Sequence, residues 1–125
     1  MSSWIAVAVG GALGSLARHW VNVQMAHRLE RSVPYATFVV NIIGCIVIGA
    51  LAGRVANGRL LLSPAMRTFL FVGVLGGFTT FSSFALDTFT LGHGGEHAAA
   101  FWNIAGQTGL GMAGVWLGYN LAVAI

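Results

Sequence analysis

Residues 76–84 read GGFTTFSSF and lie inside a long apolar segment, between FLFVGVL before them and ALDTFTL after them. Adjacent glycines and a run of hydroxyl residues favour an interruption of the helix at residues 76–80. In hydrocarbon an unpaired backbone group is costly, so irregular chain survives there only where it is buried in protein or lines a polar cavity. The stretch therefore indicates an ion-binding or permeation element more than the simpler alternative, a kink whose hydroxyls bond to their own helix.

The composition of the chain is typical of a membrane protein. Hydrophobic residues make up 57% of its 125 residues and charged residues 7%, and its mean hydropathy is +0.82. A soluble domain carries about 25% charged residues. We therefore expect an all-α integral membrane protein with a single domain over residues 1–125.

Four apolar segments are each long enough to cross a hydrocarbon core of about 30 Å. They lie at about residues 4–25, 35–51, 65–91 and 98–124, and the third is the one interrupted near its middle. Two pairs of glycines stand four residues apart, Gly10 with Gly14 and Gly114 with Gly118. Because this spacing lets helix backbones approach closely in lipid, we expect these glycines to pack helices together.

All six basic residues are arginines, and they divide evenly between the two sides of a four-span protein. One side carries Arg18, Arg28 and Arg31, and the other carries Arg54, Arg59 and Arg67. Orientation follows the Arg and Lys bias near helix ends, so this tie permits insertion both ways round and an antiparallel dimer, unless other determinants set one orientation. Four short helices enclose little interior, so we expect a homodimer. No basic cluster interleaves with aromatic residues, so no nucleic-acid partner is expected.

Several polar and aromatic residues fall at membrane depth. Asn41 places an amide inside the second span, where its N–H groups suit either a bond to another helix or a desolvated anion; the two alternatives stay open. Phe81 and Phe84 share a helix face, and the positive edges of their rings can solvate an anion, with packing as the alternative. Ser82 and Ser83 add hydroxyl donors, which otherwise bond to their own helix.

Two ionisable residues, Arg18 and Asp87, fall at the edges of the spans. For Arg18 we favour contacts with helix-end carbonyls over attraction of anions, and for Asp87 a vestibule or interface position over a proton relay. Carbonyls freed at residues 76–79 can coordinate a small cation such as Na⁺. The sequence contains no nucleophile with a histidine base, no pair of carboxylates and no phosphate loop, so an enzyme is not expected.

Three motifs of the chain resemble those of the Fluc (CrcB) fluoride ion channels. They are GGALG at residues 10–14 with Arg18, TFVVN at residues 37–41 and GGFTTFSSF at residues 76–84, and together they span most of the chain. The resemblance implies a multi-pass protein of the bacterial inner (plasma) membrane whose four-helix subunit forms an antiparallel, dual-topology homodimer. It also implies two pores per dimer that export cytoplasmic fluoride passively.

The resemblance further implies a pore lined by an amide, two aromatic ring edges and two hydroxyls. These residues are Asn41, Phe81, Phe84, Ser82 and Ser83, with the two rings of one pore coming from different subunits. It implies a structural Na⁺ on the dimer axis, held by the backbone carbonyls of Gly76 and Thr79 from both subunits. Arg18 would lie toward the aqueous vestibule, near the end of the first helix.

The chain departs from the family pattern at two places. Asp87 stands where members often carry Glu. Gly111 and Val115 stand where members commonly place Ser and Thr on the fourth helix, with Thr108 and Gln107 nearby as substitutes. These departures bear on the polar lining that the fourth helix supplies.

Two other functions compete with the fluoride channel. A small dual-topology multidrug exporter also uses four short helices, but it needs a membrane-embedded acid in the first helix, and residues 4–16 contain none. A non-transporting membrane protein leaves the pattern at residues 76–84 unexplained.

Overall fold

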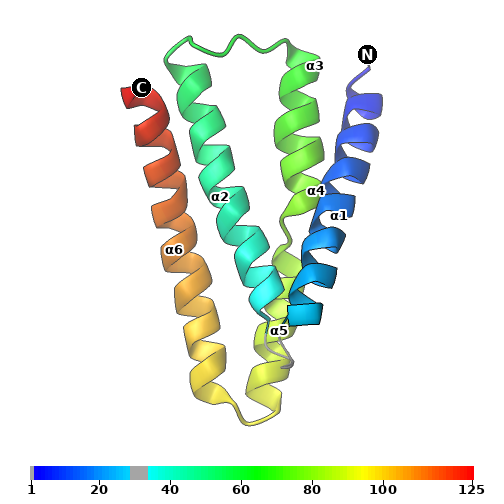
Figure 1. Cartoon of the computed structure of the whole chain (residues 1–125), viewed down its shortest axis with the longest axis vertical. Coiled ribbons are helices and arrows are strands. Elements are labelled where there is room, and N and C mark those ends of the chain that lie inside the picture. Colours follow the sequence, from blue (N-terminus) through cyan, green and yellow to red (C-terminus); the bar gives the residue numbers. More distant parts are fainter. Residues whose placement is uncertain (1, 29–33) are drawn as a thin grey trace.

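The computed structural model of the chain describes residues 2–28 and 34–125 (Figure 1). These residues are helical with no strand among them, which confirms the all-α prediction. The helices are α1 (Ser3–Arg28), α2 (Tyr35–Ala56), α3 (Pro64–Arg67), η1 (Thr68–Leu75), α4 (Gly76–Phe78), α5 (Phe81–His93) and α6 (His97–Ala124). Arg31, one of the arginines in the charge comparison, lies outside the described residues.

The helices of the described residues form four long segments, with α3, η1, α4 and α5 following one another in the third (Figure 1). Residues Tyr35–Ala56 and Pro64–His93 are both long and apolar enough to cross a membrane. The less apolar α1 and α6 have 26 and 28 residues, which also suffices for about 30 Å at about 1.5 Å per residue. Both chain ends lie at one end of the molecule, and the α5–α6 turn lies at the other.

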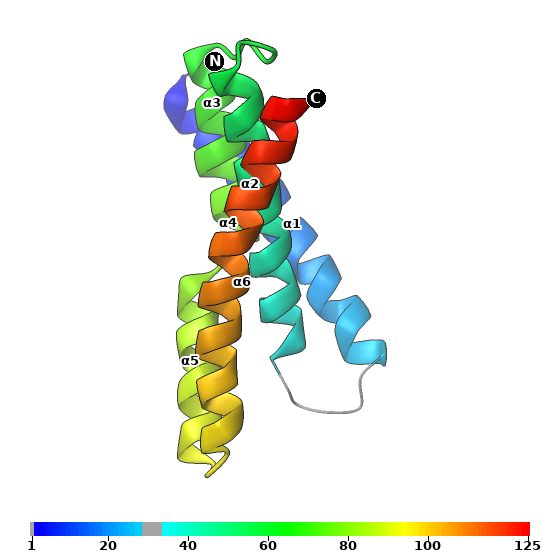
Figure 2. The same ribbon diagram turned by 90° about the vertical axis from the view of Figure 1, so that its left-hand side faces the viewer.

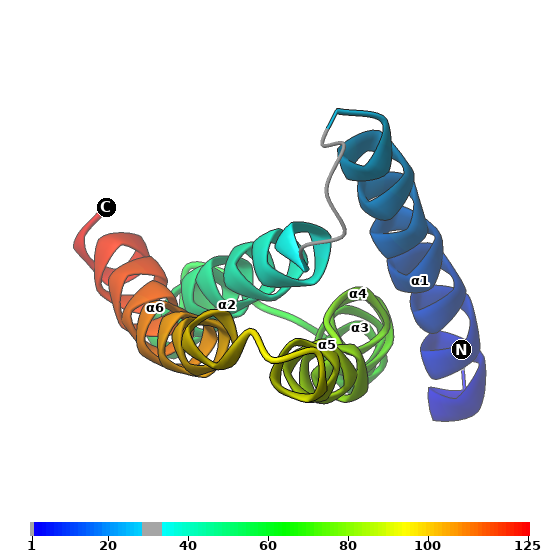
Figure 3. The same cartoon turned by 90° about the horizontal axis from the view of Figure 1, so that it is seen from below.

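Helices α2 and α6 lie side by side along most of their length (Figures 1 and 3). Small residues allow this close approach. A Cβ atom added to Gly53 would lie 2.6 Å from the carbonyl oxygen of Tyr119, and one added to Gly118 would strike the backbone of Ile46. One added to Gly114 would lie 3.1 Å from Ile46 Cγ1. The predicted packing role of Gly114 and Gly118 is therefore confirmed.

Helix α1 packs instead against the first half of the third segment (Figure 3). A Cβ atom on Gly10 would lie 2.6 Å from the carbonyl oxygen of Phe69, and one on Gly14 would strike the backbone of η1. From the opposite side, a Cβ atom on Gly77 would lie 2.6 Å from the carbonyl oxygen of Gly11. The backbones of the two segments thus touch directly, as predicted for Gly10 and Gly14.

The third segment loses its helical geometry at Thr79 and Thr80, and both residues are extended. Thr79 has φ −81° and ψ 161°, and Thr80 has φ −154° and ψ 115°. We expected irregular backbone from Gly76 onward, but Gly76 and Gly77 are helical. Gly77 is needed for close packing and not for the interruption, because a side chain at this position would not fit against α1. The Thr80 hydroxyl then caps α5 by accepting a hydrogen bond from the Ser83 N–H at 3.2 Å.

The single chain buries few apolar side chains. Among the described residues the buried apolar ones are Ala6, Val40, Leu75, Leu91 and Ala122. Large apolar side chains instead face outward along the molecule, with Trp4 84% and Trp102 68% exposed. Figure 2 shows that α5 and α6 run together while the C-terminal end of α1 diverges from α2. An apolar surface of this extent requires lipid or another chain to cover it.

Candidate functional site

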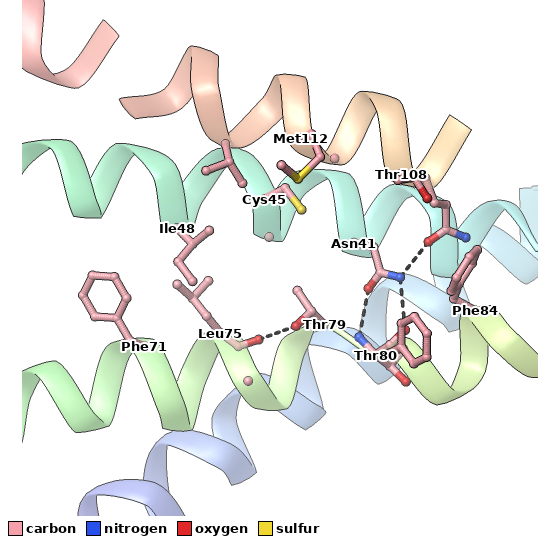
Figure 4. A pocket seen from close by; sticks show the side chains of 16 residues that line it. Asn41, Cys45, Ile48, Phe71, Leu75, Thr79, Thr80, Phe84, Thr108 and Met112 are labelled. Atoms are coloured by element: carbon pink, nitrogen blue, oxygen red, sulfur yellow. Dashed lines mark hydrogen bonds between the residues drawn. The ribbon is translucent and has the colours of Figure 1, made fainter. Parts of the chain in front are cut away.

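The site is built around the extended pair Thr79–Thr80, which α2 holds through a single side chain. The Thr80 N–H donates to Asn41 Oδ1 at 2.9 Å, and Asn41 Nδ2 donates to the Thr80 carbonyl at 3.1 Å (Figure 4). The carboxamide thereby pairs with both backbone groups of Thr80, as a neighbouring strand would. Two roles were left open for Asn41, and these hydrogen bonds show that it makes the bond to another helix.

Helix α1 contacts Thr79 and the helical turn before it. Arg18 Nη1 donates to the Thr79 carbonyl at 3.1 Å, and Ser15 Oγ lies 3.5 Å from the Gly77 carbonyl oxygen. The N–H and the hydroxyl of Thr79 both donate to the Leu75 carbonyl, each at 3.0 Å. The contact with a carbonyl freed from its helix is the role we favoured for Arg18, and its vestibule position stays a prediction.

A chain of side-chain hydrogen bonds runs from Asn41 across α6 to α5. Asn41 Nδ2 donates to Gln107 Oε1 at 2.7 Å, and Gln107 Nε2 donates to Asn103 Oδ1 at 3.0 Å. Asn103 Nδ2 donates to Thr88 Oγ1 at 2.8 Å, and the Thr88 hydroxyl donates to the Phe84 carbonyl at 2.8 Å. Asn103 and Gln107 are buried. These amides therefore bond to one another rather than to water, which meets the requirement that buried polar groups be paired.

The first turn of α5 brings the predicted aromatic and hydroxyl residues to this place. The rings of Phe81 and Phe84 lie 5.5 Å apart between centroids and are inclined at 59°. Phe81 is nonetheless 78% exposed, so its contact with Phe84 covers only a small part of its ring. The Thr80 hydroxyl donates to Ser83 Oγ at 3.1 Å and lies 3.3 Å from Ser82 Oγ. The five predicted pore residues are thus brought together around Thr80.

A pocket of about 430 Å³ opens between α2, α6 and the third segment. Its polar side chains gather at one end, where Asn41, Thr80 and Phe84 lie, while Ile48 and Phe71 line the opposite end (Figure 4). The wall from α6 includes Gln107, Thr108, Gly111 and Val115. The positions where hydroxyls were expected therefore do face the pocket, and Gln107 and Thr108 supply polar groups beside them.

Asp87 lies three residues beyond Phe84 on α5. Its Oδ2 atom is buried and has no hydrogen-bond partner among the described residues. Its predicted vestibule or interface position stays a prediction.

The two carbonyls expected to hold Na⁺ stand in different surroundings. The Thr80 N–H, which a continuous helix would direct to the Gly76 carbonyl, donates to Asn41 instead, and Gly76 is exposed. The Thr79 carbonyl accepts from Arg18 with one of its two lone pairs, which leaves the second for an ion. The described residues hold no group of three or more His, Cys, Asp or Glu that could bind a metal, so a cation here would depend on backbone oxygens. The donor chemistry of Gly76 and Thr79 fits such an ion.

The comparison with known protein families agrees with this architecture. The family model described as "CrcB-like protein, Camphor Resistance (CrcB)" matches residues 5–119. The chain belongs to the CrcB family. The resemblance inferred from the three motifs is thereby confirmed.

Curated relatives of this CrcB chain match it over nearly its whole length. A protein of Paracoccus denitrificans is 48% identical over 120 aligned residues, covering 95% of this chain and 93% of the relative. A protein of Rhodospirillum rubrum is 44% identical over 124 aligned residues, covering 98% and 96%. One of Paramagnetospirillum magneticum is 39% identical over 126 aligned positions, covering 100% and 98%. Each of the three is named "Fluoride-specific ion channel FluC".

Two residues of the CrcB site were missed in the sequence, and a third was undervalued. Asn103 and Thr88 did not figure among the candidates, and Gln107 figured only as a substitute for a hydroxyl. A signal for two of them was present, since Asn103 and Gln107 are four residues apart in an apolar helix and so share one face. Thr88 had no comparable signal, because a threonine in a helix most often bonds to its own backbone, as it also does here.

Proposed function

We propose that this CrcB chain is a fluoride-selective ion channel of a bacterial membrane. The whole-length similarity to relatives named fluoride-specific channels supports the ion. The observation that carries the proposal is the extended pair Thr79–Thr80 at the wall of a pocket, with Asn41 and two phenylalanine rings beside it. In a membrane-spanning segment irregular backbone is tolerated where it lines a polar path, and the polar end of this pocket beside Thr80 is consistent with such a path.

The groups around the pocket suit a small anion that is strongly hydrated. Fluoride must exchange its water for donors, and Asn41 on the pocket wall offers an amide. Ser82 and Ser83, which lie on the first turn of α5 and not among the residues that line the pocket, offer hydroxyl donors beside it. Phe81 and Phe84 offer positive ring edges. All these groups are neutral, so they can solvate the ion without holding it as a fixed positive charge would, and conduction requires that an ion also leave. Export of cytoplasmic fluoride down its gradient needs no coupled reaction.

The pathway is completed by a second copy of the chain. The large exposed apolar surface and the 78% exposure of Phe81 both favour a partner subunit over this face. The even division of arginines favours an antiparallel arrangement, in which each pore takes one ring from each subunit. Such a dimer has two pores related by symmetry.

A structural Na⁺ between the two copies is part of the same proposal. Backbone carbonyls of Gly76 and Thr79 from both chains would hold the ion and neutralise the negative ends of the interrupted helices. When bound, the ion supplies a fixed positive charge that orients these carbonyls. Arg18 holds the Thr79 carbonyl within each chain.

Fluoride efflux from liposomes that contain the purified protein tests the channel. A cation ionophore relieves the membrane voltage, and chloride efflux is measured in parallel. Rapid release of fluoride without chloride supports the proposal, and its absence in a well-folded dimer contradicts it for the native chain. The double variant Gly111→Ser with Val115→Thr then decides whether the fourth helix is responsible, because it restores the expected hydroxyls on the pocket wall.

A further inference from the structure

Asn41 has no N–H left for an anion in this structure. Its Nδ2 atom carries two hydrogens, and two acceptors take them, the Thr80 carbonyl at 3.1 Å and Gln107 Oε1 at 2.7 Å. The Thr80 bond belongs to the support of the extended backbone, because the same carboxamide also accepts from the Thr80 N–H. The hydrogen that points toward α6 is therefore the one an anion can use, and Gln107 occupies it.

Backbone groups at both ends determine the direction of every hydrogen bond in this chain. The Thr80 N–H can only donate, so the Asn41 atom that faces it is the oxygen and Nδ2 is turned toward Gln107. At the other end the Phe84 carbonyl can only accept, so the Thr88 hydroxyl donates its single hydrogen to that carbonyl. Thr88 must then accept from Asn103, whose amide in turn accepts from Gln107. Gln107 is left with only its oxygen to present to Asn41.

Gln107 is also held firmly in this place. It is 8% exposed and Asn103 is 7% exposed, so neither amide has water as an alternative partner. The bond from Asn103 to Thr88 ties the pair to α5. The Gln107 nitrogen is therefore anchored, whereas the one hydrogen bond of its oxygen among the described residues comes from Asn41, and Gln107 lines the same pocket as Asn41.

We propose that Gln107 determines the affinity of the pathway for fluoride by occupying the place of the anion on Asn41. In the ion-free channel its Oε1 accepts the Asn41 hydrogen, so that no buried donor is left unpaired. Fluoride enters by displacing this oxygen and leaves when the oxygen returns. The inference rests on the proposed channel function, and it adds a residue of α6 that competes with the ion.

The exchange favours an ion close to oxygen in size. The Asn41 nitrogen and the Gln107 oxygen are 2.7 Å apart, a short hydrogen bond that a compact acceptor can reproduce. Fluoride is close to an amide oxygen in radius, whereas chloride is larger and cannot approach the Asn41 nitrogen to 2.7 Å. The competition keeps binding weak enough for conduction while it preserves selection by size.

The test compares the fluoride dependence of flux in the wild type and in Gln107→Met. Methionine retains the length of the side chain but lacks the acceptor oxygen, so the half-saturating fluoride concentration is expected to fall about three- to tenfold. Asn120→Leu is the matched control, since Asn120 is an amide of α6 that bonds only within its own helix, to the Trp116 carbonyl at 2.7 Å. An unchanged or increased half-saturating concentration in Gln107→Met, with the control like the wild type, overturns the inference and leaves the channel function standing. If the wild-type protein shows no fluoride flux, both the inference about Gln107 and the proposed channel function are overturned.

A second measurement needs no variant. In wild-type protein labelled with ¹⁵N in its side-chain amides, titration with sodium fluoride is expected to shift the Gln107 resonances together with those of Asn41, with sodium gluconate as the control salt. Displacement changes the environment of both amides, because their mutual hydrogen bond is lost. A shift of Asn41 with Gln107 unmoved contradicts the displacement, even if Gln107→Met fails to fold.

Discussion

At the scale of single residues, Asn41 connects the stability of the interrupted backbone to the proposed ion path. Its carboxamide pairs with both polar groups of Thr80 and also reaches Gln107 on α6. In the proposed channel, the bond to Thr80 and the bond to the ion use different hydrogens of the same amide. A change at this residue is therefore expected to affect structure and transport together.

Asn41→Asp is expected to abolish fluoride flux. The carboxylate has no donor for the ion and places a negative charge in its path, and it leaves the acceptors on Thr80 and Gln107 unpaired. The free energy of unfolding is expected to fall by about 1–3 kcal/mol, with the oligomeric state kept. Asn57→Asp is the control, because Asn57 follows the last residue of α2 and its amide bonds to the end of α6 outside the pocket. Flux at the wild-type rate through dimeric Asn41→Asp would refute the pore role.

Phe81→Ile is expected to slow fluoride flux by about fivefold while leaving the free energy of unfolding of the single chain unchanged. The ring edge contributes about 1 kcal/mol to the ion, and an aliphatic side chain of similar size has no such edge. Because Phe81 is 78% exposed, its loss removes little packing. Phe89→Ile, at a 67% exposed position of the same helix, is the matched control. Equal flux in both variants would assign Phe81 to packing.

At the scale of elements, the third segment depends on its neighbours for two residues of its backbone. Arg18 from α1 holds the Thr79 carbonyl and Asn41 from α2 holds Thr80, so two helices satisfy groups that a continuous helix would satisfy by itself. Gly76 and Gly77 beside this site are helical, and Gly77 serves close packing with α1. The interruption is therefore a tertiary feature, although the residues that permit it are local.

Arg18→Met is expected to lower the free energy of unfolding by about 1–3 kcal/mol, since it leaves the part-buried Thr79 carbonyl without its charged donor. The free energy of unfolding of Arg18→Lys should lie between those of the wild type and Arg18→Met, because an ammonium keeps the charge but not the planar fork of the guanidinium. The measurement is denaturant unfolding in detergent. Arg28→Met, at the exposed end of the same helix, should change stability little. Equal losses at the two arginines would count against a specific contact of Arg18.

At the scale of the whole molecule, the single chain leaves much apolar surface uncovered. Few apolar side chains are buried among the described residues, and the pocket that Asn41, Phe81 and Phe84 line is open. Lipid covers apolar side chains but cannot pair polar ones, so the polar end of the pocket favours protein as its cover. The antiparallel dimer proposed above meets this requirement.

The antiparallel dimer can be tested by adding arginines to one side of the chain, so that the two sides no longer carry equal numbers. His93→Arg with His97→Arg adds two positive charges on the side of Arg18, and one orientation should then dominate. If the two pores require opposed subunits, flux per protein should fall strongly. A second double variant, Ser2→Arg with Ser3→Arg, adds its charges on the opposite side and should favour the opposite orientation. Co-expression of the two double variants should restore the flux. Full flux from the first variant alone, shown to be uniformly oriented, would exclude the antiparallel arrangement.

The sequence by itself determined the helical class, the family and the set of candidate residues, because each of these depends on local or additive properties. Apolar content and segment length identify membrane helices without reference to neighbours. The three motifs identify the family by residue order alone. The position of the interruption was predicted to within a few residues, since Gly and Thr act on the backbone at their own positions.

Only the tertiary structure decided which polar groups meet. Asn41 and Gln107 are 66 residues apart, and Arg18 and Thr79 are 61 residues apart. Whether such pairs touch depends on the rotation of each helix about its axis and on its shift along a neighbour, and the glycine contacts between backbones set both. That is why the amides of α6 were undervalued in the sequence and why the helical glycines were mistaken for the interruption. The composition of a helix indicates which side chains it can bury, but the packing of the helices determines which residues those side chains contact.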